Sequence, residues 1–207
     1  MINEDIIDYI VAARLNPNDP KVHDRLGYVF FSRGLFYKAL DEFKKAIQLE
    51  SNDIHAHNGL GHVFDRIGMF DEAIKEYTVA IHMSPNNPQF HYGLGQVLRK
   101  KGASDDAVKE YKEALRIRSD FPEAHYALGH VYKNRGALDD AVQEYQEALR
   151  LKPDFPEAHY TLGLVFYKKG LMSESIYEFN EAIRLNPDFK EARFYLQNIH
   201  KNILKGI

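Results

Sequence analysis

The chain has no cysteine among its 207 residues. A disulfide framework and cysteine-based metal or redox chemistry are therefore excluded. No apolar run approaches the length that a membrane-spanning helix needs, and the stretch from Met1 to Asp5 is acidic where a signal peptide would be basic. These absences favour a cytoplasmic protein, which a partner could still hold peripherally at a membrane surface.

An excess of charge of one sign is also missing. The 27 basic and 30 acidic residues leave a formal net charge of -3, and the two signs are interspersed along the chain. Nothing in this balance favours binding to nucleic acid or to an acidic membrane. The C-terminal segment is mildly basic, and we interpret it as the end of the fold rather than as a membrane-binding helix.

A 34-residue repeat organises the sequence. The heptapeptide from Asp120 to Tyr126 returns unchanged from Asp154 to Tyr160. Such a period predicts stacked supersecondary units that share one continuous core. The dipeptide Leu-Gly and a later glycine keep the same spacing throughout: Leu26-Gly27 and Gly34, Leu60-Gly61 and Gly68, Leu94-Gly95 and Gly102, Leu128-Gly129 and Gly136, Leu162-Gly163 and Gly170.

One unit predicts a pair of short helices. Asp120 can cap the first helix, Pro122 suits its first turn, and Gly136 ends it. The second helix follows and ends before Pro153. Small residues such as Gly129 leave room for the two helices to approach closely, and Tyr145 fills the gap between them.

These features resemble the tetratricopeptide repeat (TPR), whose pattern of aromatic, Leu-Gly, aromatic, Ala, Phe, Ala and Pro spans 34 residues. Histidine replaces the leading tryptophan of that pattern in all five units, at His23, His57, His91, His125 and His159. The resemblance implies an all-α, right-handed superhelical solenoid. It also implies that the first helix of each unit lines a concave groove, which takes up extended or helical peptide segments.

The predicted order is an orphan helix, five repeats and a capping helix in one continuous solenoid domain. The orphan helix occupies residues 1–19. The repeats span 20–53, 54–87, 88–121, 122–155 and 156–189, and the C-terminal capping helix occupies 190–207.

The orphan helix carries an unusual apolar stripe of Ile7, Ile10 and Val11. The equivalent positions in the later second helices hold mostly polar residues. We expect this stripe either to be covered by the chain itself or to contact another molecule, because a helix this short needs a packing surface. Self-association through the stripe, giving a homo-oligomer, is the functional interpretation.

Helix spacing defines a candidate peptide groove. Residues four apart share a helix face, so side chains of the first helices form rows along the repeats. One row ends at Phe194 on the capping helix. The aromatic and cationic residues of these rows suit a partner with apolar or aromatic anchors and some acidic residues. The groove residues are Tyr92, Gln96, Arg99, Tyr126, His130, Lys133, Tyr160, Tyr167 and Lys168.

Catalysis and metal binding find no support in the sequence. It has no Gly-rich phosphate loop, no metal-ligand motif and no Ser–His–acid set. The five periodic histidines lie one repeat apart, about 10 Å by helix packing distances, which is too far to share an ion. We predict a non-enzymatic scaffold with no metal and no cofactor.

The predicted function is protein–protein interaction, by peptide capture in the groove and self-association through the orphan helix. The layout is similar to that of bacterial magnetosome-associated TPR scaffolds, which coat an organelle membrane. The Lys and Asn clamp of chaperone-binding TPR proteins is not matched at Asp24, Tyr28, Asn58 and His62. An alternative class is the regulatory or substrate-docking region of a larger enzyme, such as a glycosyltransferase.

Overall fold

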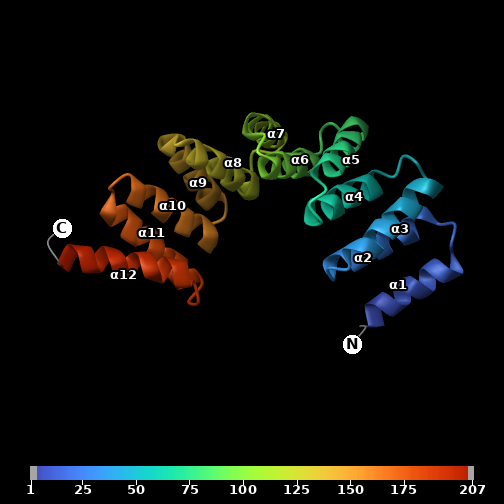
Figure 1. The fold of residues 1–207 in the computed structure, drawn as a ribbon, viewed down its shortest axis with the longest axis horizontal. Coiled ribbons are helices and arrows are strands. Elements are labelled where there is room, and N and C mark those ends of the chain that lie inside the picture. Colours follow the sequence, from blue (N-terminus) through green and yellow to red (C-terminus); the bar gives the residue numbers. More distant parts are fainter. Residues whose placement is uncertain (1–3, 205–207) are drawn as a thin grey trace. The chain divides into compact units, whose positions relative to one another are not determined.

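The computed structural model describes residues 4–204, and all regular structure in that range is α-helical (Figure 1). The fold class expected from the sequence, an all-α series of tandem hairpins, is confirmed. The helices are α1 (Glu4–Leu15), α2 (Pro20–Ser32), α3 (Phe36–Leu49), α4 (Ile54–Arg66), α5 (Phe70–Met83), α6 (Pro88–Lys101), α7 (Ser104–Ile117), α8 (Pro122–Arg135), α9 (Leu138–Leu151), α10 (Pro156–Lys168), α11 (Met172–Leu185) and α12 (Lys190–Leu204).

The chain separates into two compact units, Met1–Ile117 and Arg118–Ile207. Unit 1 contains α1 and the hairpins α2–α3, α4–α5 and α6–α7, and unit 2 contains the hairpins α8–α9 and α10–α11 followed by α12. We call the side of each unit formed by α2, α4 and α6, or by α8, α10 and α12, its first-helix face. That all repeats form one continuous domain stays a prediction.

Short polar side chains begin the first helices of unit 1. The carboxylate of Asp19 accepts a hydrogen bond from the backbone N–H of Lys21 at 3.0 Å, and Asn87 binds the N–H of Gln89 in the same way. Asp53 accepts from two backbone N–H groups at the start of α4. Each bond satisfies a donor that has no partner inside the helix.

Unit 2 begins its helices differently, and the expectation that Asp120 caps α8 is wrong. Phe121 occupies the capping position and Pro122 the first helical position. Phe121 is buried, and the guanidinium carbon of Arg118 lies 3.8 Å from the centre of its ring. Packing of this aromatic ring therefore holds the start of the helix where a polar cap was expected.

A glycine in the left-handed conformation follows the first helix of every hairpin. The φ angles of these glycines run from 72° to 87°, a region that other residues rarely adopt. The helix end predicted at Gly136 is confirmed, and Gly34, Gly68, Gly102 and Gly170 share its conformation.

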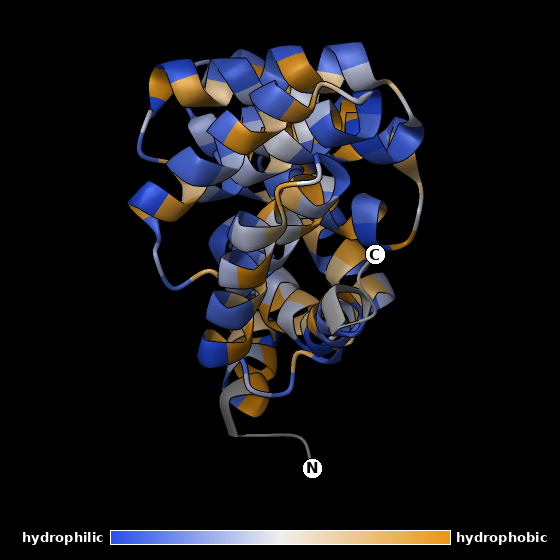
Figure 2. Ribbon diagram, turned by 90° about the vertical axis from the view of Figure 1, so that its left-hand side faces the viewer, coloured by the Kyte–Doolittle hydropathy of each residue, from blue (hydrophilic) through white to orange (hydrophobic). Residues whose placement is uncertain are grey.

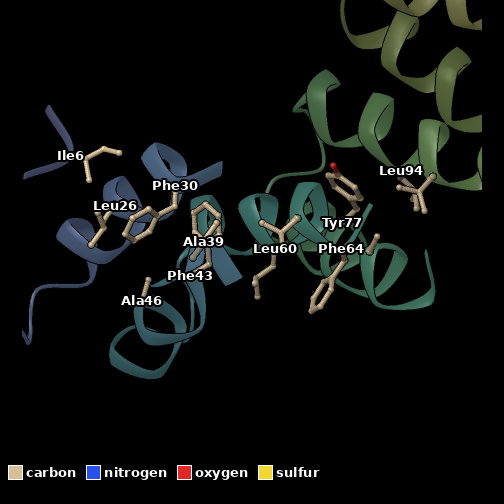
Figure 3. Packing of buried hydrophobic residues seen from close by; sticks show 14 residues of the cluster. Ile6, Leu26, Phe30, Ala39, Phe43, Ala46, Leu60, Phe64, Tyr77 and Leu94 are labelled. Carbon is tan, nitrogen blue, oxygen red and sulfur yellow. The ribbon is translucent and has the colours of Figure 1, made fainter. Parts of the chain in front are cut away.

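Buried aromatic rings of the second helices pack against glycines of the first helices. A Cβ atom at Gly129 would lie 2.8 Å from Cε1 of Tyr145, so the close approach expected from the sequence is confirmed. Phe43 is enclosed from two repeats, because Gly27 on α2 and Gly59 on α4 both abut its ring. Figure 3 shows Phe43 among the buried hydrophobic residues of unit 1. The helices carry both hydrophobic and hydrophilic residues (Figure 2), as expected of helices that bury one face and expose the other.

Candidate protein-binding surfaces

The first-helix face of unit 2 carries half-buried tyrosines at the predicted groove positions. Tyr126 on α8 packs edge-on against His130, with ring centres 4.6 Å apart, and its ring is tilted against that of Phe155, with ring centres 4.8 Å apart. Its hydroxyl lies 3.4 Å from that of Thr161 on α10. Neighbouring repeats therefore hold the Tyr126 ring in place, while part of it stays accessible.

Tyr160 continues this surface onto the next repeat. Its ring lies 4.9 Å from Phe189 and 6.3 Å from Tyr195 on α12, and Tyr195 also contacts Tyr167. Phe194, beside Tyr195, is 60% exposed. The result is an aromatic surface of rings fixed by one another, which is suited to binding because little side-chain freedom remains to be lost.

The sequence-based prediction missed three members of this aromatic surface. Phe155 and Phe189 lie in the loops before α10 and α12, and Tyr195 lies one residue from the expected row. The signal was present, because Phe121, Phe155 and Phe189 recur at the 34-residue period. The resemblance implied a groove lined by the helices alone, and these phenylalanines lie outside them.

Two lysines accompany the tyrosines of unit 2. Lys133 on α8 is half-buried, and burial lowers the pKa of its ammonium group. Lys168 at the end of α10 is exposed. Their charges favour carboxylate-bearing ligands on this face.

In unit 1 the predicted groove residues of α6 form a hydrogen-bonded set. Gln96 donates to the hydroxyl of Tyr92 at 2.6 Å and accepts from Arg99 at 3.1 Å and from Tyr111 at 3.2 Å. The structure thus brings Tyr92, Gln96 and Arg99 together as the helix spacing predicted. The Arg99 guanidinium is already engaged within the chain, which reduces its availability to a ligand.

The start of the same face is more acidic. Burial, and next the negative charge of Asp53, raises the pKa of Asp24 to about 6. Nearby, the Tyr28 hydroxyl donates to the carbonyl of His55 at 2.8 Å and accepts from Asn58 at 3.1 Å. This part of the face differs in chemistry from the tyrosines of unit 2.

The five periodic histidines each connect the two helices of a hairpin to the loop before it. The Nδ1 atom of His159 lies 2.6 Å from the Glu178 carboxylate on the second helix of the hairpin, and its Nε2 lies 3.1 Å from the Pro153 carbonyl. The same arrangement, with Nδ1–oxygen distances of 2.6 to 2.8 Å, occurs at His23–Glu42, His57–Glu76, His91–Glu110 and His125–Glu144.

This geometry assigns these histidines a structural role that the sequence interpretation missed. A carbonyl oxygen only accepts, so Nε2 donates to it, and in His125 and His159 the facing carboxylate favours a second proton on Nδ1. Burial alone would lower the pKa of His125 and of His159. The hydrogen bond and the negative charge of Glu144 or Glu178, together with the backbone hydrogen bond and a further nearby carboxylate, outweigh it, so both pKa values lie above the usual range. Each pair ties the two helices of its hairpin to the preceding loop.

The orphan helix α1 leaves part of its apolar stripe uncovered. Ile7 is 48% exposed and Val11 is 44% exposed, whereas Ile10 is half-buried against the core of unit 1. Ile6, which the predicted stripe did not include, is buried. The stripe is therefore divided between packing inside the chain and a free surface.

As far as the structure describes them, residues 4–204 contain neither of two other kinds of site. No helix in that range is both long and apolar enough to traverse a bilayer. Among the side chains that the structure describes, no three His, Cys, Asp or Glu residues converge as a metal site would require.

Comparison with protein families identifies the fold. Profiles described as TPR repeat match residues 27–68, 66–102, 95–136 and 129–170, and a tetratricopeptide repeat profile matches 156–189. The chain belongs to the tetratricopeptide repeat family. Its repeats are protein-interaction modules, so the chain is a protein-interaction scaffold. No curated protein sequence is similar enough to this chain to count as a match.

Solved TPR structures share the fold over most of the chain. YrrB, described as a TPR protein with an unusual peptide-binding site, has 24% identity and a TM-score of 0.68, covering 91% of this chain and 97% of its own. A MamA structure has 25% identity and a TM-score of 0.70, covering 81% and 97%. TTC0263, a thermophilic TPR protein from Thermus thermophilus, has 21% identity and a TM-score of 0.69, covering 87% and 98%.

Proposed function

We propose that the chain captures peptide segments of partner proteins on the first-helix face of unit 2. The supporting observation is the aromatic surface around Tyr126 and Tyr160, whose rings are held by neighbouring repeats and remain partly accessible. Tyrosine contributes strongly to interfaces because it combines a large apolar ring with a polar end. Lys133 and Lys168 favour ligands that carry carboxylates beside their apolar anchors.

Replacing Tyr126 and Tyr160 with alanine is expected to weaken binding of a captured peptide by about 30-fold. This corresponds to a loss of about 2 kcal/mol of binding free energy, which is typical when interface anchors are removed. The measurement is titration calorimetry with a peptide mapped from a co-purified partner. Tyr177→Ala is the matched control, because Tyr177 is 62% exposed on the second helix α11. Lys168→Glu is a second variant of the groove. Because Lys168 is exposed, this change should weaken peptide binding without lowering the stability of the fold. Unchanged affinity in both groove variants would exclude this face.

The exposed part of the stripe on α1 supports a second proposal, self-association. Adjacent apolar side chains left open on a terminal helix favour contact with another apolar surface. Ile7, Val11 and the neighbouring Ile10 would form such a contact between two copies. Coating of an organelle surface by such assemblies is the further part of this proposal, and it rests on the layout's similarity to magnetosome-associated TPR scaffolds.

Replacing Ile7 and Val11 with glutamate is expected to convert oligomers into monomers of 24.0 kDa in light scattering. Burying the new carboxylates in the contact between two copies would cost more free energy than the apolar contact contributes. Tyr37→Glu is the control, because Tyr37 is 72% exposed on α3. A wild-type chain that is already monomeric, or a variant with unchanged mass, would refute self-association through α1.

A further inference from the structure

A groove of about 970 Å³ lies in unit 1 between α1 and α3, above α2. Its apolar lining comes from all three helices and includes Ile10, Ala13, Leu26, Phe30 and Leu49. Pockets of this size bind drug-sized ligands or a few side chains of a protein partner. The groove is separate from the peptide-binding surface proposed above, which lies in unit 2.

A single small residue helps to open the groove. Ala13 occupies a repeat position that carries a large aliphatic side chain in every later second helix, namely Ile47, Ile81, Leu115, Leu149 and Ile183. Four of these, Ile47, Ile81, Leu149 and Ile183, are packed against the core clusters of their own units. Where α1 meets the first hairpin, the smaller Ala13 leaves this volume open for another molecule to occupy.

The groove is also unusually cationic for this chain. Lys38 stands where the later second helices carry Glu72, Asp106, Asp140 and Glu174, and Lys45 stands where the last three carry Glu113, Glu147 and Glu181. Arg14 and Lys44 add two further cations to the lining. The reversal of charge at two repeat positions coincides with the opened groove.

The acidic residues in the lining do not balance these cations. Both carboxylate oxygens of Glu42 are engaged, one by His23 at 2.6 Å and the other by Lys45 at 2.7 Å. Since Lys45 is paired with Glu42, Asp41 is the remaining acid of the lining, against Arg14, Lys38 and Lys44. The ammonium of Lys38 lies 5.6 Å from the centre of the Phe30 ring, directly above the apolar floor. An anionic group beside an apolar anchor would match both features.

We propose that this groove binds an acidic segment of a partner protein, which inserts a large aliphatic or aromatic side chain over Ala13. The inserted side chain takes the place that Ile or Leu occupies on every later second helix. Carboxylates of the partner segment beside it pair with Lys38 and Lys44. Apolar anchors in a groove, flanked by complementary charge, are a general mode of peptide recognition. A second copy of α1 fits less well, because it would bring its own Arg14 to a cationic site.

The variant Ala13→Ile tests this inference, since it introduces the residue type that the other repeats carry at this position. Displayed random peptides are selected on the wild-type chain and then counter-selected on Ala13→Ile. Ligands of the first-helix face bind both proteins and are removed, so success here does not depend on that face. We expect the remaining peptides to carry Asp or Glu beside Leu, Ile or Phe, and to bind Ala13→Ile at least about tenfold more weakly.

Charge variants supply a second measurement. Lys44→Glu should weaken the selected peptides by about tenfold, whereas Lys112→Glu, at the equivalent position on α7, should leave affinity unchanged. Lys44 is exposed, so its replacement tests binding even if Ala13→Ile fails to fold. The proposal is overturned if no peptide distinguishes wild type from Ala13→Ile, or if the selected peptides are basic. Binding of a fatty acid probe in their place, or of a peptide copying α1, would equally overturn it.

Discussion

Replacing Phe43 with alanine is expected to lower the free energy of unfolding by about 3–5 kcal/mol, the largest effect of any single change considered. The Phe43 side chain is fully buried, and its ring is enclosed by Gly27 on α2 and Gly59 on α4. Tyr28 packs edge-on against it, with ring centres 4.9 Å apart. Its removal leaves a cavity shared by three helices that the surrounding glycines have no side chains to fill.

Urea denaturation followed by circular dichroism measures this loss. Tyr37→Ala on the same helix serves as the control, because Tyr37 is largely exposed and its replacement should change the free energy of unfolding by less than about 0.5 kcal/mol. Equal losses in the two variants would mean that Phe43 does not hold the first two repeats together.

The free energy of unfolding is expected to fall as the pH rises above about 6.5, the ordinary pKa of histidine. The pKa values of His125 and His159 are raised in the folded chain, so protonation stabilises it. That stabilisation is complete below the unfolded pKa and is lost as the pH passes through the raised folded pKa. Asp24 titrates near pH 6, and His62, whose pKa is lowered by burial, titrates below 6.5, so neither obscures this window.

Replacing both Glu144 and Glu178 with glutamine should flatten this pH dependence and cost about 1–3 kcal/mol per site at pH 6.5, because a mostly buried imidazole loses its charged partner. Chemical denaturation at a series of pH values gives the comparison. Glu157→Gln is a suitable control, because Glu157 is an exposed carboxylate of the same unit. A wild-type profile that is flat, or that rises with pH, would contradict the assignment of protonated histidines.

The 34-residue period was enough to predict the fold, because packing within each hairpin is local and repeats at fixed positions. The glycine that ends each first helix, and the contact of Gly129 with Tyr145, follow from residue size and backbone freedom. The Asp120 cap was predicted wrongly, since nothing in the local sequence shows that Phe121 would be buried at the capping position.

The candidate sites were predicted less completely than the fold. The carboxylate partner of each histidine lies 19 residues away on another helix, although Glu42, Glu76, Glu110, Glu144 and Glu178 recur in phase with the histidines. The division of the α1 stripe, with Ile10 half-buried and Val11 exposed, depends on how α1 packs against α2. Helix periodicity alone does not determine that packing.

Site-specific photo-crosslinking is the most direct test of protein capture by the first-helix face of unit 2. Benzoylphenylalanine would replace Phe194 on α12 or, in a second protein, Tyr177 on α11, two side chains with nearly equal exposure of 60% and 62%. We predict discrete crosslinked partners from position 194 that disappear when Tyr126 and Tyr160 are alanine, and none from position 177. Equal crosslinking at both positions, or crosslinking from position 177 alone, would contradict binding at this face.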